Sequence, residues 1–415
     1  MLATACVTSG RGQAPAPHAL RYPTAVALDP AGDWLYVVST NFDNAYGGGT
    51  VLPVGLADLE ALRAATTVPA RGGPVRLSLK DAKLATAEPA EIGSFAGQLA
   101  FLARDGVATA GYVPIRDGDV VDWFTVARPA GVPVLACTTA TSLSRCDTAH
   151  RLSLSWKDPT GTYGTLVGSE PFALAVGEGV VPGTPLIYVG SVADGTFSVV
   201  TVADDGKPSV ATAIPLSPGL HTVVEGPLLE SGRVVYVSNR TVDGIHAVQV
   251  EKVADGTLHV ATIPSAVLPQ VTSTGDYFRG MAASKGRRLV YAATRSPAGL
   301  AVFDVVDDGT LSLRGLVPLH GLPAEVATAP GAVAGDEMVY VTDFHDDGVY
   351  AVDPLAMAVV ARIEVGDGPY GIAVQGDPAA GPLRAYVALF EEDGLSVVDL
   401  DPASPTYHTE IARLK

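Results

Sequence analysis

This 415-residue chain contains a series of similar segments, and six of them carry a polar or aromatic residue at the same place near the segment's start. The set combines an amide, an imidazole, a guanidinium, a carboxylate and aromatic rings: Gln98, Phe172, His221, Arg279, Glu325 and Tyr370. Such a mixture can hold a small polar ligand in a concave site, and an imidazole beside a carboxylate can bind a metal ion weakly. The alternative is that these groups satisfy one another in a hydrated channel, as buried polar groups usually do.

Carboxylates gather at a second place, in the turn DFHDDG at Asp343–Gly348, with Asp43 and Asn44 at the matching turn of the first segment. Oxygen ligands of this kind suit a hard cation such as calcium. Aspartate is also frequent in turns because it hydrogen-bonds its own backbone, and we expect that role here.

A third grouping combines Arg116, Asp117, Asp147 and His150. An aspartate next to a histidine can orient a catalytic base. We expect instead that Arg116 and Asp147 form an ion pair that fixes the loop between them.

Several sequence motifs of catalysis and cofactor binding are absent. The chain has no GxSxG, HExxH, Walker loop or strict GxGxxG, and no CxxC or CxxCH. This disfavours the nucleophile elbow, zinc peptidase, nucleotide, haem-attachment and thioredoxin classes. The sequence therefore assigns no catalytic residue, no metal and no cofactor.

A repeated strand must position these side chains. Seven tyrosines occupy one recurring place, in LYVVS, GYVPI, IYVGS, VYVSN, VYAAT, VYVTD and AYVAL: Tyr36, Tyr112, Tyr188, Tyr236, Tyr291, Tyr340 and Tyr386. The last four intervals are 48, 55, 49 and 46 residues, about the length of one propeller blade. We therefore predict an all-β fold, a seven-bladed β-propeller of four-stranded antiparallel blades.

Each repeat has the same order of strands and turns. An innermost strand precedes the tyrosine strand, and a D-G turn such as Asp347-Gly348 or Asp393-Gly394 then leads into a third strand. In this alignment the candidate ligand residues stand where the innermost strands begin, at the mouth of the channel. We expect the tyrosine rings to pack between sheets with their hydroxyls at a wet rim.

The first two intervals are longer, at 76 residues each. The first holds an excursion from about Ala57 to Glu91, in which LADLEALRAA forms a short helix or an elaborated outer strand. We expect residues 1–20 to be a flexible tether and residues 21–415 a single propeller, with a disulfide-bearing insertion around residues 129–165. A strand from one terminus should close the ring, because closure removes free sheet edges.

The bulk charge limits the partners. The formal net charge is −17 and the sequence shows no basic stripe, which disfavours binding to nucleic acid and electrostatic docking on anionic lipid. The charge serves solubility or attracts a cationic partner or metal ions. No run of 18 apolar residues occurs that would predict a membrane span.

The three cysteines suggest export. The start MLATAC resembles a bacterial lipobox, which predicts lipidation of Cys6, although the residues before it are too few for an export signal. Cys137 and Cys146 bracket one loop, CTTATSLSRC, and are expected to form a disulfide of an oxidising compartment. The alternatives are a free cysteine in a disordered tail and two reduced thiols in the cytosol.

The tyrosine strands also carry a family resemblance. VYVSN at Val235–Asn239, with YVTD and YVVS, resembles the YVTN family of bacterial surface β-propellers over nearly the whole chain, Tyr22 to Leu414. The opening LYVVSTNFDNAYGGGTVLPV and the RCDTAH loop are similar to myxobacterial propeller lipoproteins. This resemblance implies a secreted or envelope-anchored propeller. VADGTLHVATI and VDDGTLSLRGL look like outer strands of lactonase-type propellers of the same fold group.

Two functions are therefore expected. The first is a non-enzymatic lipoprotein of the outer membrane or periplasm-facing envelope, which binds a protein partner there or scaffolds a surface, membrane or redox assembly. The alternative is a lactonase-type hydrolase that uses His221, Arg279 and Glu325 at the channel mouth, with or without a divalent cation.

Overall fold

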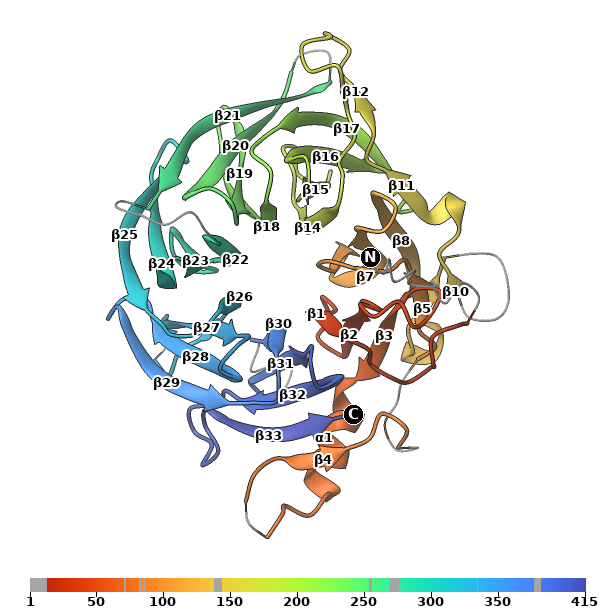
Figure 1. Ribbon diagram of the computed structural model, residues 1–415, viewed down its shortest axis with the longest axis vertical. Helices are drawn as coiled ribbons and strands as arrows, with labels where there is room; N and C mark the ends of the chain where they lie inside the picture. The colour runs from red at the N-terminus through yellow and green to blue at the C-terminus, as the bar shows by residue number, and fades with distance from the viewer. Residues whose placement is uncertain are drawn as a thin grey trace, which may run out of the picture.

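Seven antiparallel sheets surround a central channel in the computed structural model, in chain order around the ring (Figure 1). The structure describes residues 13–415 apart from 71, 82–83, 85–86, 138–143, 254–255, 269–275, 334 and 377–381. The predicted all-β, seven-bladed propeller is confirmed. Cys6 lies outside the described residues, so its predicted lipidation stays a prediction.

The third to seventh blades follow the predicted order, from an innermost to an outermost strand. The third comprises β14 Pro171–Gly177, β15 Leu186–Ser191, β16 Thr196–Val202 and β17 Pro208–Pro215. The fourth comprises β18 Leu220–Leu229, β19 Gly232–Asn239, β20 Gly244–Lys252 and β21 Leu258–Val267. The fifth comprises β22 Phe278–Ala283, β23 Leu289–Arg295, β24 Ala298–Val305 and β25 Leu311–Pro318. The sixth comprises β26 Pro323–Pro330, β27 Glu337–Asp343, β28 Gly348–Asp353 and β29 Ala358–Glu364, and the seventh β30 Pro369–Gln375, β31 Arg384–Leu389, β32 Gly394–Asp399 and β33 Thr409–Leu414.

The tyrosine strands are buried on both faces, because each blade packs between two neighbours. All seven tyrosines are at most 1% exposed. The predicted wet rim is wrong for most of their hydroxyls, which bond within the protein. Tyr112 and Tyr236 donate to the turn of the next blade, at the carbonyl oxygens of Gly206 (2.7 Å) and Gly309 (2.8 Å). These bonds tie successive blades together.

The first two blades carry the predicted irregularities. Blade one comprises β1 Pro23–Leu28, β2 Trp34–Ser39, β3 Gly49–Gly55 and β5 Ala90–Ile92. Blade two comprises β6 Ala100–Arg104, β7 Val107–Ile115 and β8 Val120–Ala127, and its outer position is shared by β9 Val134–Ala136 and β11 Arg151–Ser153. A separate hairpin, β12 Trp156–Lys157 with β13 Thr165–Leu166, precedes blade three.

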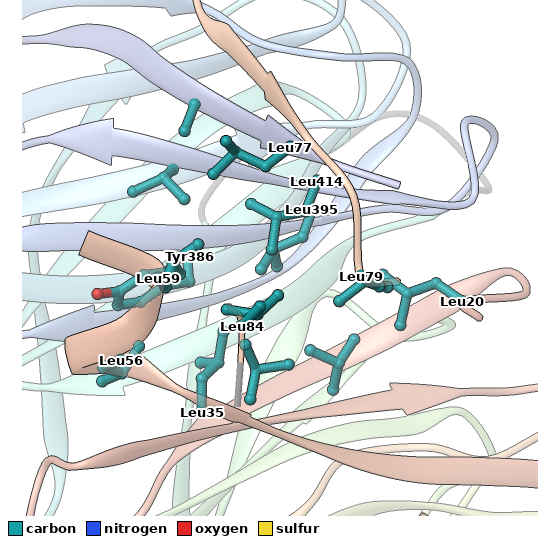
Figure 2. Close-up of a cluster of buried hydrophobic side chains, with 14 of the residues drawn as sticks. Leu20, Leu35, Leu56, Leu59, Leu77, Leu79, Leu84, Tyr386, Leu395 and Leu414 are labelled. Atoms are coloured by element: carbon teal, nitrogen blue, oxygen red, sulfur yellow. The ribbon is translucent and has the colours of Figure 1, made fainter. Parts of the chain in front are cut away.

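The excursion from blade one closes the ring. Its LADLEALRAA segment is α1, Leu56–Ala65, and the following β4, Val75–Leu77, pairs in parallel with β33 of blade seven. The seam between the two blades is apolar, and Leu59, Leu79 and Leu84 pack with Tyr386 and Leu414 (Figure 2). The expected closing strand from a terminus is therefore wrong in origin, since an internal segment covers the edge. No helix among the described residues has the length and hydropathy to cross a membrane.

The cysteine loop joins blade two to blade one. Cys137 and Cys146 form the predicted disulfide, and the short strand β10, Ser144–Arg145, pairs in parallel with β5. The backbone N–H of Cys146 donates to the carbonyl oxygen of Glu91 at 2.9 Å. The loop thus fastens the outer edges of two blades to each other.

Candidate ligand site at the channel mouth

One hydrogen bond recurs in all seven blades and fixes the rim of the channel. The residue four places after the repeated tyrosine donates its backbone N–H to a carbonyl oxygen at the entry of the blade, at 2.9–3.3 Å. The acceptor directly precedes the innermost strand in six blades, and in the second blade it is Phe95, five residues before β6. The donors are Thr40, Arg116, Val192, Arg240, Arg295, Phe344 and Phe390. Each blade therefore presents one side chain at an equivalent point of the rim, and the sequence decides its chemistry.

The innermost strands deliver the second set of side chains. In β14, β18, β22, β26 and β30 the register shifts directly after the first paired residue, as in a β-bulge. A bulge re-aims side chains, so the residues within it can point into the channel. Phe172, His221, Arg279 and Tyr370 are the second residues of their strands, whereas Glu325 is the third residue of β26.

A cavity of about 220 Å³ lies in the channel, lined by residues of all seven blades, including Gln98, Phe172, Glu325 and Tyr370. This is below the size of pockets for drug-sized ligands, roughly 300–1,000 Å³, and suits a smaller molecule.

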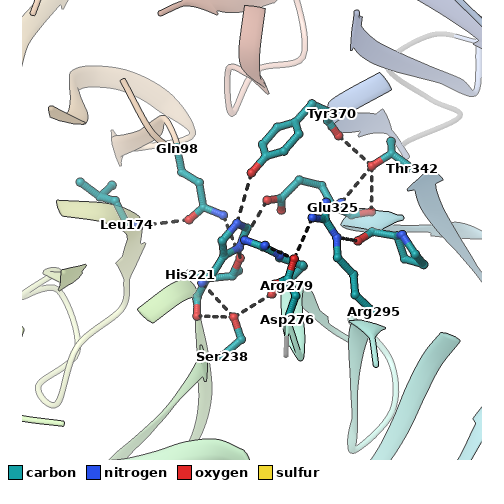
Figure 3. A network of polar contacts seen from close by, with 12 residues as sticks. Gln98, Leu174, His221, Ser238, Asp276, Arg279, Arg295, Glu325, Thr342 and Tyr370 are labelled. Atoms are coloured by element: carbon teal, nitrogen blue, oxygen red, sulfur yellow. Dashed lines mark hydrogen bonds and ion pairs between the residues drawn. The ribbon is translucent and has the colours of Figure 1, made fainter. Parts of the chain in front are cut away.

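The five predicted ligand residues lie together in one polar network (Figure 3). The Nε2 atom of His221 lies 3.2 Å from the Tyr370 hydroxyl, and its Nδ1 atom lies 3.9 Å from Oε1 of Glu325. Gln98 donates to the Thr222 hydroxyl at 3.2 Å. The Phe172 ring packs against the imidazole, with 4.8 Å between ring centres.

Burial leaves the two ionisable groups at the centre of this network neutral at pH 7. Removal from water raises the pKa of Glu325 to about 8, opposed by the guanidiniums of Arg279 and Arg295 and by Gln98. Removal from water, with Arg279, Arg295 and Arg240 nearby, holds the pKa of His221 well below its usual value. The Oε1 atom of Glu325 has no hydrogen-bond partner among the described residues, although its side chain lines the cavity.

Guanidiniums surround this neutral pair. Asp276 is shared by Arg279 and by Arg295, the latter at 3.0 Å, and both arginine side chains are only 13% exposed. Arg116 bonds Glu170 at 3.1 Å through Nε.

The Arg240 guanidinium has no hydrogen-bond or ion-pair partner within the described part of the chain. Its pKa is lowered by burial and by the nearby Arg279 and Arg116. The mouth therefore has four guanidiniums and two carboxylates that pair with them. The guanidiniums are those of Arg116, Arg240, Arg279 and Arg295, and the carboxylates are those of Glu170 and Asp276. Although the whole chain has a net charge of −17, this mouth has a local excess of positive charge. Such an excess favours an anionic ligand.

The sequence pattern predicted the site residues at the entries of the innermost strands but not the arginines at the rim position. Arg240, Arg295 and Asp276 belong to the network, yet none was predicted. The signal was present, because both arginines stand four residues after a repeated tyrosine.

The other two groupings have structural roles. The predicted ion pair of Arg116 with Asp147 is wrong, because Asp147 caps the turn Thr148–His150 and bonds the His150 ring at 3.0 Å. In the DFHDDG turn, Oδ1 of Asp343 accepts backbone N–H groups, including that of Leu322 at 2.8 Å. In the described ranges no three histidine, cysteine or acidic side chains converge as metal ligands would.

Comparison with known proteins shows a similar fold in solved structures and a weak, local sequence similarity to curated proteins. No family model matches the chain. A 6-phosphogluconolactonase of Yersinia pestis (strain Pestoides F) is 30% identical over 97 residues, 23% of this chain and 26% of that protein. The match thus spans about a quarter of the curated relatives' length.

Solved structures extend the similarity to most of the chain. A Lactobacillus plantarum protein superposes with a TM-score of 0.57 at 15% identity, over 84% of this chain and 86% of that one. A putative 6-phosphogluconolactonase of Bacteroides uniformis gives 0.56 at 15% identity, over 86% and 88%. Such low identity shows the propeller fold alone, and the predicted resemblance to the YVTN family stays a prediction.

Proposed function

We propose that this propeller binds an anionic sugar lactone at the channel mouth and hydrolyses it. The observation that carries the proposal is Glu325, a carboxyl group that lines the cavity, has a pKa of about 8 and lies near the guanidiniums of Arg279 and Arg295. A pKa near the working pH is what a general base requires. The local match to 6-phosphogluconolactonases supports the same reaction class.

Glu325 acts first as base and then as acid in this scheme. The ionised form of Glu325, whose share grows as the pH approaches its pKa of about 8, takes a proton from a water molecule. The water oxygen forms a bond to the lactone carbonyl carbon while the carbonyl electron pair moves onto oxygen. When the carbonyl re-forms, the ring C–O bond breaks and the ring oxygen takes the proton from Glu325. Lactone and water thus give the open hydroxy acid, and the residue returns to its starting state.

The arginines supply the charge that this reaction needs. A guanidinium opposite the carbonyl oxygen stabilises the negative charge that develops there, and Arg279 lies beside Glu325 in the network. Arg240, which has no partner among the described residues, is free to pair with an anionic substituent such as a phosphate or carboxylate. Neutral His221 orients the Tyr370 hydroxyl without adding a competing charge.

Substitution of Glu325 tests the proposal. Hydrolysis of 6-phosphogluconolactone and gluconolactone is followed by proton release, after subtraction of the spontaneous rate. Glu325→Gln should lower kcat by about 10²–10⁴-fold, the usual contribution of a general base, while the open-chain acid still binds. Glu364→Gln, on the exposed outer strand of the same blade, is the matched control. Equal kcat in both variants would refute the proposed role.

Metal analysis distinguishes the two forms of the lactonase hypothesis. Stoichiometric metal in the purified protein, together with activity lost on chelation, would add a Lewis acid to the scheme. Activity that survives chelation supports the protein groups alone.

The predicted envelope scaffold, with its lipid anchor, its export and its protein partner, stays a prediction.

A further inference from the structure

The rim of the channel is divided into two chemically different halves. At the repeated rim position the second, fourth and fifth blades present Arg116, Arg240 and Arg295, whereas the sixth and seventh present Phe344 and Phe390. The same backbone hydrogen bond holds both kinds of residue, so the difference is one of side chain only. The arginine half belongs to the site already described, and the aromatic half has no role in it.

Five rings form this aromatic half, which we name the aromatic ledge: Tyr22, Phe42, Phe95, Phe344 and Phe390. Neighbouring ring centres within it are 5.2–5.9 Å apart. The ledge adjoins the cavity, because Phe344 lies edge-on to Tyr370, which lines the cavity, with 6.1 Å between the ring centres. A ligand bound in the cavity can therefore reach the ledge past the Tyr370 ring.

Two rings of the ledge are held by strained backbone. Tyr22 and Phe95 have φ of +48° and +58°, in the left-handed region that bulky residues avoid. At the equivalent place the third blade has Glu170 with φ of +53°, and the fourth and seventh blades have Gly219 and Gly368, with φ of +103° and +64°. The left-handed conformation therefore belongs to this turn of the blade, and the two rings occupy it at a cost that glycine would avoid.

The ledge is partly exposed and edged by polar groups. Phe42 is 52% exposed and the other four rings are half-buried, so the cluster presents an apolar surface larger than one side chain. Arg21 bonds Asp43 at 3.0 Å and Asp393 at 2.9 Å directly beside it. Apolar ring faces next to fixed charges suit a sugar unit, whose C–H face stacks on aromatic rings while its hydroxyls bond at the edge.

We infer that the aromatic ledge is a second subsite, which takes a neutral sugar ring attached to the anionic unit in the cavity. The inference rests on the proposed function and specifies its substrate class, lactones of two-unit sugar acids in which the lactone unit also carries a phosphate or carboxylate group, rather than lactones of single sugars. The first unit lies against Glu325 and the arginines, and the second stacks over Phe42 and Phe390.

Binding of two stable product analogues tests the subsite. Titration calorimetry compares gluconate, a single unit, with cellobionate, which adds one glucose ring. Cellobionate should bind about 3- to 10-fold more tightly, the gain expected from one stacked ring. Phe42→Ala should abolish that gain and leave the affinity for gluconate unchanged. Val360→Ala, at an equally exposed residue (52%) of β29, should change neither.

A second variant tests the ledge with a substitution that the local backbone tolerates. Phe95→Gly removes a ledge ring while glycine accepts the left-handed backbone, so the fold should persist and the gain for cellobionate should fall.

Equal binding of both acids, or a gain that survives in both variants, would overturn the subsite and leave the lactonase proposal standing. Tighter binding of 3-phenylpropionate than of cellobionate would show that the ledge selects aryl groups and not sugars. Failure of either aldonate to bind, with hydrolysis unaffected in Glu325→Gln, would overturn both proposals.

Discussion

The raised pKa of Glu325 predicts a pH-dependent stability that a single substitution should remove. Between pH 4.5 and about 8 the unfolded chain ionises this carboxyl while the folded chain keeps it protonated. The folded state then binds more protons, so the free energy of unfolding falls as pH rises. Glu325→Gln keeps the size and neutrality of the protonated acid and has nothing to ionise.

The magnitude follows from the two pKa values. Each unit of pKa difference is worth about 1.4 kcal/mol, so a change from 4.5 to about 8 corresponds to about 5 kcal/mol once pH exceeds 8. Water that enters the channel with the ionised group lowers this cost, and we expect the variant to be more stable than the parent by about 2–5 kcal/mol at pH 9. Near pH 5 the two should be alike.

The assay is urea unfolding of both proteins from pH 5 to 9, followed by tryptophan fluorescence. Subtraction of the two curves at each pH removes the contributions of all other titrating groups. Glu364→Gln should run parallel to the parent at every pH. If the difference in stability between Glu325→Gln and the parent stays constant from pH 5 to 9, Glu325 ionises normally. The proposal that Glu325 is the general base would then lose the raised pKa on which it depends.

Three further outcomes are expected. Tyr236→Phe should lower stability by about 1–3 kcal/mol in urea unfolding, because it leaves the buried carbonyl oxygen of Gly309 without its hydrogen-bond donor. Tyr36→Phe should be nearly neutral, because the Tyr36 hydroxyl has no hydrogen-bond partner in the described chain. Replacing Cys137 and Cys146 together by serine should lower stability by about 2–3 kcal/mol relative to the oxidised parent, as expected for a loop of this length, and should make no difference relative to the reduced parent. Cys6→Ala should release the protein from membranes on cell fractionation, and unchanged retention would contradict the predicted lipid anchor.

Local patterns explain why most of the fold was predictable. Apolar runs and D-G turns act over about ten residues, so each hairpin can be inferred from its own segment. The tyrosine repeat then gave the number of blades. The closure by β4 and the connection by β10 were not predictable, because strands of three and two residues carry no periodic pattern and pair with partners far away in the chain.

The candidate site was predictable in part for the same reason. Aligned repeats located Gln98, His221, Arg279, Glu325 and Tyr370, and the structure brings all five into one network. Asp276 was missed because it lies outside the repeated positions and joins two arginines only in the folded ring. The partner of Arg116 was predicted wrongly, because the Glu170 that it bonds belongs to the next blade.

Short-range pattern and repetition were enough to predict a ring of seven hairpin-built sheets and the kinds of side chain that line its channel. The chemistry of those side chains depends on the folded ring. A carboxyl acquires a pKa of about 8, and an acidic protein acquires a cationic mouth, only when strands hundreds of residues apart exclude water from the same small space.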